Sequence, residues 1–238
     1  MYKLFISAFL FLITTATFAQ DKKVAVVTFY ADKRIDLSDF GLNAGADLLK
    51  LEEDPNFNLG PLVTDYHNQF FNEYAKSFPF QLVPETDITG STVYTAYVPD
   101  DRPMQDKDAK YTPAAGYKTI DYNWGSKNEK SLLKLFDKYD GIMFVSIHFK
   151  MIKGFAVGGT GTVKVRAITQ IVLLNKNDEK VFKIIEASNS KKTGISVANL
   201  PVLKPEKVLP MCESALSELM EDLQKRIPKI IKKTEAKL

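Results

Sequence analysis

Residues 132–149 read LLKLFDKYDGIMFVSIHF, and this stretch decides the fold. Its first part spaces apolar residues at helical intervals and follows an S-x-x-E capping box made by Ser126 and Glu129. Its second part, Ile142 to Phe149, is an almost continuous apolar run, which is typical of a strand covered on both faces. Asp140-Gly141 separates the two parts. The stretch therefore predicts a helix that leads directly into a buried strand.

Elements of the same kind precede this unit. Lys23 to Tyr30 (KVAVVTFY) is a compact apolar run that predicts a central strand. A helix is expected from Thr64, as its N-cap, to Pro79, and Phe80 to Val83 predicts a short strand. Aromatic residues recur along this helix at three- and four-residue spacing, and we interpret them as core: Tyr66, Phe70, Phe71, Tyr74 and Phe78.

The last third of the chain predicts an antiparallel hairpin and a closing helix. Thr162 to Asn175 alternates apolar and polar residues, and Lys180 to Ala187 follows after a turn. The glycine-rich segment Gly154 to Gly161 is expected to reverse the chain before this hairpin. An apolar stripe from Val208 to Ile227 predicts a long amphipathic helix, which Pro228 is expected to kink or end.

The order of elements is strand, helix, strand, helix, strand, strand, strand, helix. It predicts an α/β (mixed α+β) fold with a mixed sheet, in which early parallel strands are joined by antiparallel strands at the edge. We expect one domain over residues 20–238, with long irregular insertions at 31–62 and 85–125. The first insertion holds a weak helical pattern near Leu42 to Leu51.

The first nineteen residues have the pattern of a cleavable signal peptide. A charged start at Lys3 is followed by an apolar run over residues 4–13 and by Thr17-Phe18-Ala19, which places the cut before Gln20. The run is about half of the roughly 20 apolar residues that cross a bilayer. We therefore expect an exported protein, periplasmic or secreted, without an N-terminal lipid-bearing Cys and without a later transmembrane segment.

The composition disfavours nucleic-acid partners and excludes an intramolecular disulfide. The formal charge is +3, and basic and acidic residues are interspersed, which disfavours nucleic-acid binding. Cys212 is the only cysteine, so no intramolecular disulfide can form. Because it lies on the apolar stripe of the last predicted helix, a buried, inert thiol is expected.

The sequence names no reaction and no cofactor. His67 and His148 are the only histidines, and neither belongs to a metal-ligand spacing. No G-x-S-x-G motif nominates a nucleophile, although a triad assembled from distant residues stays open. The glycines of residues 158–161 join two predicted strands and favour a hairpin connection over a phosphate loop. Four aspartates favour a solvated acidic turn over a calcium loop: Asp100, Asp101, Asp106 and Asp108.

The insertion at 85–125 is rich in aromatic residues. These side chains either contact a partner or ligand, or fold back as a lid over the core. The candidate contact residues are Tyr94, Tyr97, Tyr111, Tyr117, Tyr122 and Trp124.

The order of elements resembles a family of envelope α/β domains that includes the curli-secretion lipoprotein CsgG, the N-terminal domain of TolB and the LpoB-type activators of peptidoglycan synthases. The stretches that carry the resemblance are KVAVVTF at 23–29, FQLV at 80–83 and residues 132–149, in which Lys138-Tyr139-Asp140-Gly141 runs into a strand. The resemblance implies envelope scaffolding or partner binding and supplies no catalytic residues. The lipid-bearing Cys of the anchored members is missing here.

Three functions follow as hypotheses. The first is a non-enzymatic envelope scaffold whose loop at 85–125 contacts another envelope protein. The second is a periplasmic module that binds a small molecule or a glycan through the same loop. The third is a hydrolase with a scattered site, which requires a pocket joining a histidine to Ser or Asp.

Overall fold

The computed structural model describes residues 22–41, 51–100, 110–123, 126–198 and 200–231. The strands are β1 (Lys23–Asp36), β2 (Gln81–Leu82), β3 (Tyr111–Pro113), β4 (Gly141–Val157), β5 (Thr160–Asn175), β6 (Lys180–Asn189), β7 (Gly194–Val197) and β8 (Leu200–Pro201). The α-helices are α2 (Gly60–Asn72), α3 (Glu85–Thr89), α4 (Thr92–Ala96), α6 (Lys127–Leu135) and α7 (Pro205–Ile231). Three short 3-10 helices join them: η1 (Ser38–Phe40), η2 (Leu51–Glu53) and η3 (Tyr74–Ser77). The signal segment, the weak helix expected near 42–50, Trp124 and the aspartates of 101–109 lie outside the described residues.

The strands form one mixed sheet, which confirms the predicted fold class. β1 pairs in parallel with β2 on one side and with β4 on the other. β4, β5 and β6 then pair antiparallel in succession. The short strands complete the edges: β3 pairs with β1, β7 with β5, and β8 with β7. The parallel pairs join strands that a helical segment separates in the chain, as the alternating sequence pattern predicted.

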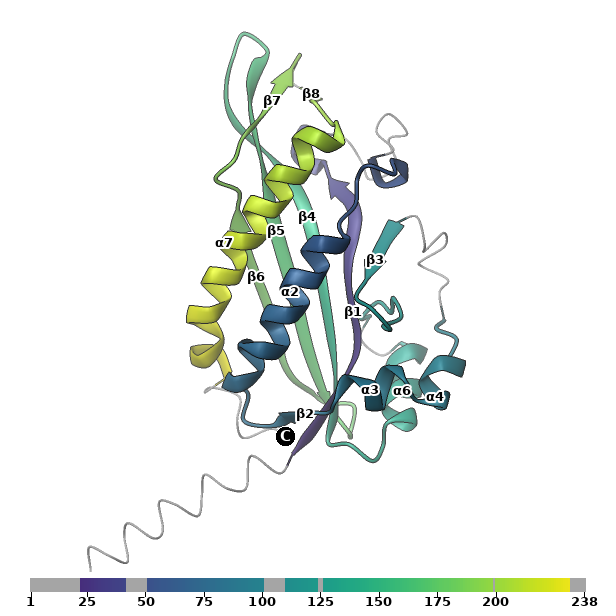
Figure 1. Cartoon of the computed structure of the whole chain (residues 1–238). Coiled ribbons are helices and arrows are strands. Elements are labelled where there is room, and N and C mark those ends of the chain that lie inside the picture. The colour runs from purple at the N-terminus through teal and green to yellow at the C-terminus, as the bar shows by residue number, and fades with distance from the viewer. Residues whose placement is uncertain (1–21, 42–50, 101–109, 124–125, 199, 232–238) are drawn as a thin grey trace, which may run out of the picture.

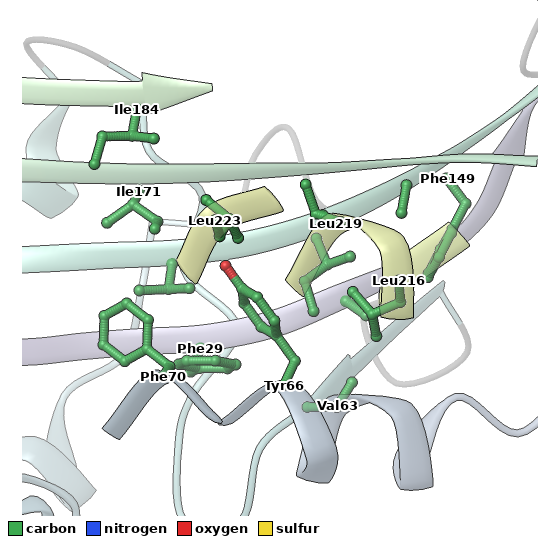
Figure 2. Close-up of a cluster of buried hydrophobic side chains, with 14 of the residues drawn as sticks. Phe29, Val63, Tyr66, Phe70, Phe149, Ile171, Ile184, Leu216, Leu219 and Leu223 are labelled. Carbon is green, nitrogen blue, oxygen red and sulfur yellow. The ribbon is translucent and has the colours of Figure 1, made fainter. Parts of the chain in front are cut away.

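One face of the sheet is covered by α2 and α7, which lie side by side across it (Figure 1). Figure 2 shows the core between them: Tyr66 and Phe70 of α2 meet Leu219 of α7 over Phe29 of β1. All four side chains are buried, and full burial of such a side chain stabilises the fold by roughly 1.5–3 kcal/mol. The aromatic stripe is therefore core, as predicted, apart from the half-buried Phe71.

On the opposite face of the sheet, the described helices cover only one end. There, side chains from α3, α4 and α6 close over the ends of β1, β4 and β5 in a second cluster of buried residues. Its members include Ile88, Tyr94 and Leu132 above Ile142 and Phe144. Beyond this cluster, most side chains on the same face of β4, β5 and β6 are partly or fully exposed. The sheet is thus closed on one side and half open on the other.

Several element boundaries differ from those expected. β1 continues to Asp36 and takes the first residues of the expected insertion at 31–62. α2 begins at Gly60 instead of Thr64, because Pro61 fits the first helical turn, where its missing N–H costs no bond. In the segment 85–125, α3, α4 and β3 pack against the sheet. Ser126 accepts a hydrogen bond from the Glu129 amide, 3.3 Å away, which confirms the predicted N-cap.

Two further expectations concern helix and hairpin ends. α7 runs past Pro228 to Ile231, because the buried Ile227 and Ile231 on either side of the proline hold the last turn against the sheet. The glycine-rich reversal is confined to Gly158 and Gly159, whose φ values of 59° and 81° suit a two-residue hairpin turn. β4 and β5 therefore extend to this turn as one long hairpin, which projects beyond the upper end of α7 in Figure 1. Among the described residues, no helix is long and apolar enough to cross a membrane.

Candidate functional site

The aromatic residues expected to contact a partner are mostly packed inside the protein. Tyr94, Tyr111 and Tyr117 are buried, and Tyr97 and Tyr122 are half-buried. The Tyr97 hydroxyl donates to Asn128 Oδ1, 2.7 Å away, and the Tyr122 ring packs on Phe144 with centroids 5.6 Å apart. Tyr94, Tyr97 and Tyr122 pack in the second cluster of buried residues, Tyr117 packs in the main core, and Tyr111 packs on Tyr30. Trp124 lies outside the described residues.

Tyr94 stabilises a bulge in β1. The register between β1 and β4 shifts between Val26 and Thr28, so Val27 is an extra, bulged residue. The Tyr94 hydroxyl donates to the Val27 carbonyl, 2.8 Å away, and accepts from the Lys118 amide at 2.8 Å. Buried backbone groups need such partners. The loop around residue 118 is thereby tied to the sheet.

A second irregularity of β1 builds a polar cluster. Ala31 pairs with Ile147 and Ile35 with Phe149, so Asp32, Lys33 and Arg34 together oppose the single residue His148. Bulges of this kind re-aim side chains and are frequent beside functional sites. The neighbouring strand β3 brings Tyr111 opposite Asp32. Side chains from β1, β3 and β4 therefore meet at this bulge, on the half-open face.

The centre of the cluster is a two-point ion pair. Arg34 donates through Nε to Asp32 Oδ1 at 2.9 Å and through Nη2 to Asp32 Oδ2 at 2.6 Å. The guanidinium also lies 4.9 Å from the ring centroid of Tyr111 and donates to the Tyr111 hydroxyl. Burial raises the pKa of Asp32, but hydrogen bonds from His148 and Arg34 outweigh burial and hold that pKa below its ordinary value. Asp32 is therefore a carboxylate at neutral pH.

His148 joins this pair to a serine and a second carboxyl. Its Nδ1 lies 3.7 Å from Asp32 Oδ2, and its Nε2 lies 3.1 Å from Ser146 Oγ. The Tyr30 hydroxyl donates to Asp121 Oδ1 at 3.4 Å on the same face. Burial raises the pKa of Asp121 above its ordinary value, although the nearby His148 acts in the opposite direction. His148 and Arg34 keep 40% and 37% of their side chains exposed, so these two face the solvent.

Three neighbouring side chains follow the order hydroxyl, imidazole, carboxylate that serine hydrolases use: Ser146, His148 and Asp32. Their setting argues against a nucleophilic role. Ser146 is 6% exposed and lies in a central strand, paired with Tyr30 on one side and Gln170 on the other. The backbone amides of this stretch serve the sheet ladder, whereas an oxyanion hole needs amides that point at the substrate. The arrangement is suited to orienting His148 as a binding group.

His148 also lies in the half-open face of the sheet. Direct cross-strand pairs extend from it in three rows across β4, β5 and β6. We call these residues the open patch: Ser146, Gln170 and Ile185; His148, Ile168 and Ala187; Lys150, Arg166 and Asn189. All except Ser146 are partly or fully exposed, and Ile185 is 56% exposed. The open patch continues into Arg34 at the β1 bulge.

The remaining candidates of the sequence analysis are structural. His67 Nε2 lies 2.5 Å from Glu85 Oε1 and packs among aromatic rings, with Phe71 at 4.8 Å between centroids. Cys212 is fully buried, which confirms its expected burial, and burial raises the pKa of its thiol well above the ordinary value. Among the described residues, no three His, Cys, Asp or Glu side chains are placed to hold a metal ion.

The sequence analysis singled out His148 but missed Asp32, Arg34 and Asp121. One signal was present: Asp32-Lys33-Arg34 is a charged triplet that directly follows an apolar strand. Such triplets ordinarily mark the end of a strand, and the pairing of β1 to Asp36 beyond them is a tertiary effect.

Comparison with known proteins yields distant structural neighbours. No family model and no curated protein matches the chain. One similar structure is the hypothetical protein CT253 from Chlamydia trachomatis, with 7% identity, a TM-score of 0.40, and coverage of 91% of this chain and 98% of that one. Another is a neuraminyllactose-binding hemagglutinin homologue from Helicobacter pylori, with 7% identity, a TM-score of 0.39, and coverage of 91% and 92%. At this level of similarity, neither carries an argument about function.

Proposed function

We propose that the protein is a non-enzymatic partner-binding domain of the cell envelope, and that its open patch receives a short acidic segment of a partner protein. The observation that carries this proposal is the half-covered sheet. α2 and α7 bury one face completely, while on the other face the helices α3, α4 and α6 cover one end. A sheet face with exposed apolar side chains is a surface that a partner can bury.

The size and flatness of the open patch suit a peptide segment. Its outer strands, β4 and β6, are separated by two strand spacings, or about 10 Å, and its rows span about 13 Å along the strands. Small-molecule sites are typically concave and enclosed. A flat array of this size matches one extended segment, which is smaller than the interface of two whole domains.

The chemistry of the open patch selects an acidic segment. Arg166 and Lys150 are direct neighbours across β4 and β5, and Arg34 stands at the edge. Asp32 and Arg34 neutralise each other in their ion pair, and Lys150 pairs with Asp39 at 2.8 Å and with Asp36 at 3.8 Å. Arg166, whose Nε donates to Asn189 Oδ1, is then the main cation of the open patch. Ile168, between these cations and Ile185, supplies apolar surface. Carboxylates beside apolar side chains would complement this pattern in charge and in burial.

The decisive experiment captures the partner from solubilised envelope and maps its contact. A photo-crosslinking residue at position 185 should label a partner, and the labelled peptide should be acidic. Arg166→Glu and Ile185→Asp should each abolish capture, because one reverses a charge and the other removes apolar surface. The matched controls are Lys130→Glu, on the exposed side of α6, and Val98→Asp. Val98 is 81% exposed and lies at the end of the sheet that α3, α4 and α6 cover.

The outcomes separate the hypotheses. Loss of the partner with both patch variants and retention with both controls supports the proposal. Capture that is equal for all variants excludes the open patch as the binding surface. If no protein is labelled, and if glycans or small molecules raise the melting temperature instead, the second hypothesis of a ligand-binding module replaces this one.

A further inference from the structure

The tip of the β4–β5 hairpin gathers five of the eight exposed large apolar side chains among the described residues. The tip consists of residues 153–163 of the hairpin together with β7 and β8, which pair onto β5 there. Its apolar members are Phe155, Val157, Ile195, Val197 and Leu200, which are 78%, 69%, 58%, 56% and 47% exposed. In Figure 1 this tip projects beyond the helices that cover the rest of the sheet.

These side chains share one face of the tip. Val157 pairs with Thr160, Ile195 with Thr162, and Val197 with Leu200. Because side chains alternate along a strand, residues two apart on one strand and direct partners on the next lie on the same face. The opposite face is occupied, since a Cβ on Gly194 would come within 3.0 Å of the Met211 side chain of α7. The base of the tip thus has one packed face and one exposed apolar face, and toward the turn both faces are exposed, at Ala156 and Val157.

The charged residues of the tip segments are mostly basic. Between residues 150 and 166 the chain has basic residues and no acid. Between residues 190 and 207, Glu206 is the single acid among four lysines. Lys191 and Lys192 pair with Glu218 and Glu213 of α7. The exposed Lys204 and Lys207 stand at the start of α7, and Lys164 lies on the apolar face itself.

We infer that the tip docks on the surface of an anionic lipid bilayer. Apolar side chains enter the boundary between headgroups and acyl chains, while the surrounding lysines meet anionic headgroups. Each lysine near such a surface adds to the attraction, which salt screens. A protein groove would accept the apolar side chains too, but the near absence of acids around them favours a uniformly anionic surface. This docking is independent of the protein partner proposed for the open patch.

The test measures co-sedimentation of the purified protein with vesicles. Vesicles of phosphatidylcholine with one third phosphatidylglycerol are compared with vesicles of phosphatidylcholine alone. The protein should sediment with the anionic vesicles and be released by high salt. The double variant Phe155→Glu with Val157→Glu should bind anionic vesicles at least about tenfold more weakly than the wild-type protein. Val98→Glu is the matched control, because Val98 is as exposed as Phe155 but lies at the other end of the sheet.

A second readout reports insertion of the tip. In a Trp124→Phe background, Phe155→Trp places the only tryptophan at the tip, and its emission should shift to shorter wavelength when anionic vesicles are added. Unchanged melting temperatures show that the variants are folded. Absence of vesicle binding by the wild-type protein overturns the inference. So does a concentration-dependent dimer that the double variant disrupts, because the tip would then be covered by a second copy.

Discussion

The hydroxyl of Tyr94 donates a hydrogen bond to the carbonyl of Val27, 2.8 Å away, at the point where β1 bulges against β4. The same hydroxyl accepts from the Lys118 amide. Thr28, the next residue of β1, donates to the Lys118 carbonyl and accepts from the Ile120 amide. Side-chain groups thus satisfy backbone groups that a regular ladder would have paired, and the bulge is held in place.

Replacement Tyr94→Phe should therefore destabilise the protein by about 1–3 kcal/mol, because it leaves a buried carbonyl and an amide without their partner. The loss should appear as a lower midpoint in urea denaturation with an unchanged slope. Tyr139→Phe on the half-buried Tyr139 is the control and should change the midpoint little. Equal losses for the two variants would show that the hydroxyl of Tyr94 has no special role.

Burial raises the pKa of Tyr94 to about 12, so this phenol should stay protonated at pH 10 in the folded protein.

Asp32→Asn should weaken the fold at neutral pH, because Arg34 and His148 lose a carboxylate. A hydrogen bond to a charged group contributes about 1.5–3 kcal/mol, and Asp32 provides more than one. Since the pKa of Asp32 is lowered in the folded state, its contribution is complete above the ordinary pKa of 3.8 and is lost as the pH falls through the folded pKa. The urea midpoints of wild type and variant should therefore differ most at pH 7, and the difference should narrow as the pH is lowered below 3.8. A gap that is independent of pH would contradict this reading.

Asp121→Asn is expected to stabilise the fold at neutral pH, whereas Asp32→Asn weakens it. The pKa of Asp121 is raised in the folded state, first by burial, so the folded protein holds its proton more tightly than the unfolded chain does. Stability then falls as the pH rises from the ordinary pKa to the folded pKa, and the ionised carboxylate costs free energy at pH 7. The variant, which keeps an oxygen to accept from Tyr30, should melt at a higher temperature than wild type at pH 7. The two melting temperatures should meet at pH 3, and a lower melting temperature for the variant at pH 7 would refute the assignment.

The thiol of Cys212 should react with Ellman's reagent only after the protein unfolds, because the residue is fully buried and its pKa is raised by burial. Cys212→Ser should cost about 1–3 kcal/mol, since it places a hydroxyl in the apolar contact between α7 and the sheet. Cys212→Ala separates the effect of polarity from that of lost volume. Rapid labelling in native buffer would mean that α7 opens at that position.

The export prediction rests on residues 1–19, which lie outside the described structure. If the protein is expressed with its own N-terminus in a bacterial host with a Sec pathway, the mature form should begin at Gln20. Intact-mass measurement of the protein from the periplasmic fraction checks the cleavage site. A full-length chain retained in the cytoplasm would remove the basis for an envelope function.

Local pattern was enough to predict the main elements. The apolar run of residues 142–149 predicted β4, the alternation of residues 162–175 predicted β5, and the Ser126 cap predicted the start of α6. These signals succeed because strand alternation and helix capping are properties of neighbouring residues. Boundaries failed where packing overrides the local pattern. β1 and β4 are longer than their apolar runs, and β7 and β8 have no pattern of their own and exist as pairing partners of β5.

The candidate site could not be predicted in the same way. The tyrosines of residues 94–122 were expected either to contact a partner or ligand or to fold back over the core, and which of these a tyrosine does depends on distant backbone groups. Tyr94 is buried because Val27 and Lys118 require its hydroxyl, and neither of them is near it in the chain. His148 was visible as a candidate from the sequence, whereas its neighbours Asp32 and Asp121 come from residues that no local spacing relates to it.

The sequence by itself determined the fold class, the parallel start and antiparallel end of the sheet, the aromatic core of α2 and the burial of Cys212, because each follows from periodicity over a few turns or strand repeats. Only the tertiary structure decided which polar residues meet and which face stays open. Register between strands is set by long-range pairing, and the two bulges of β1 shift that register at Val27 and across Asp32 to Arg34. Those shifts bring Asp32 to His148, and the short reach of α3, α4 and α6 leaves the open patch beside them in solvent.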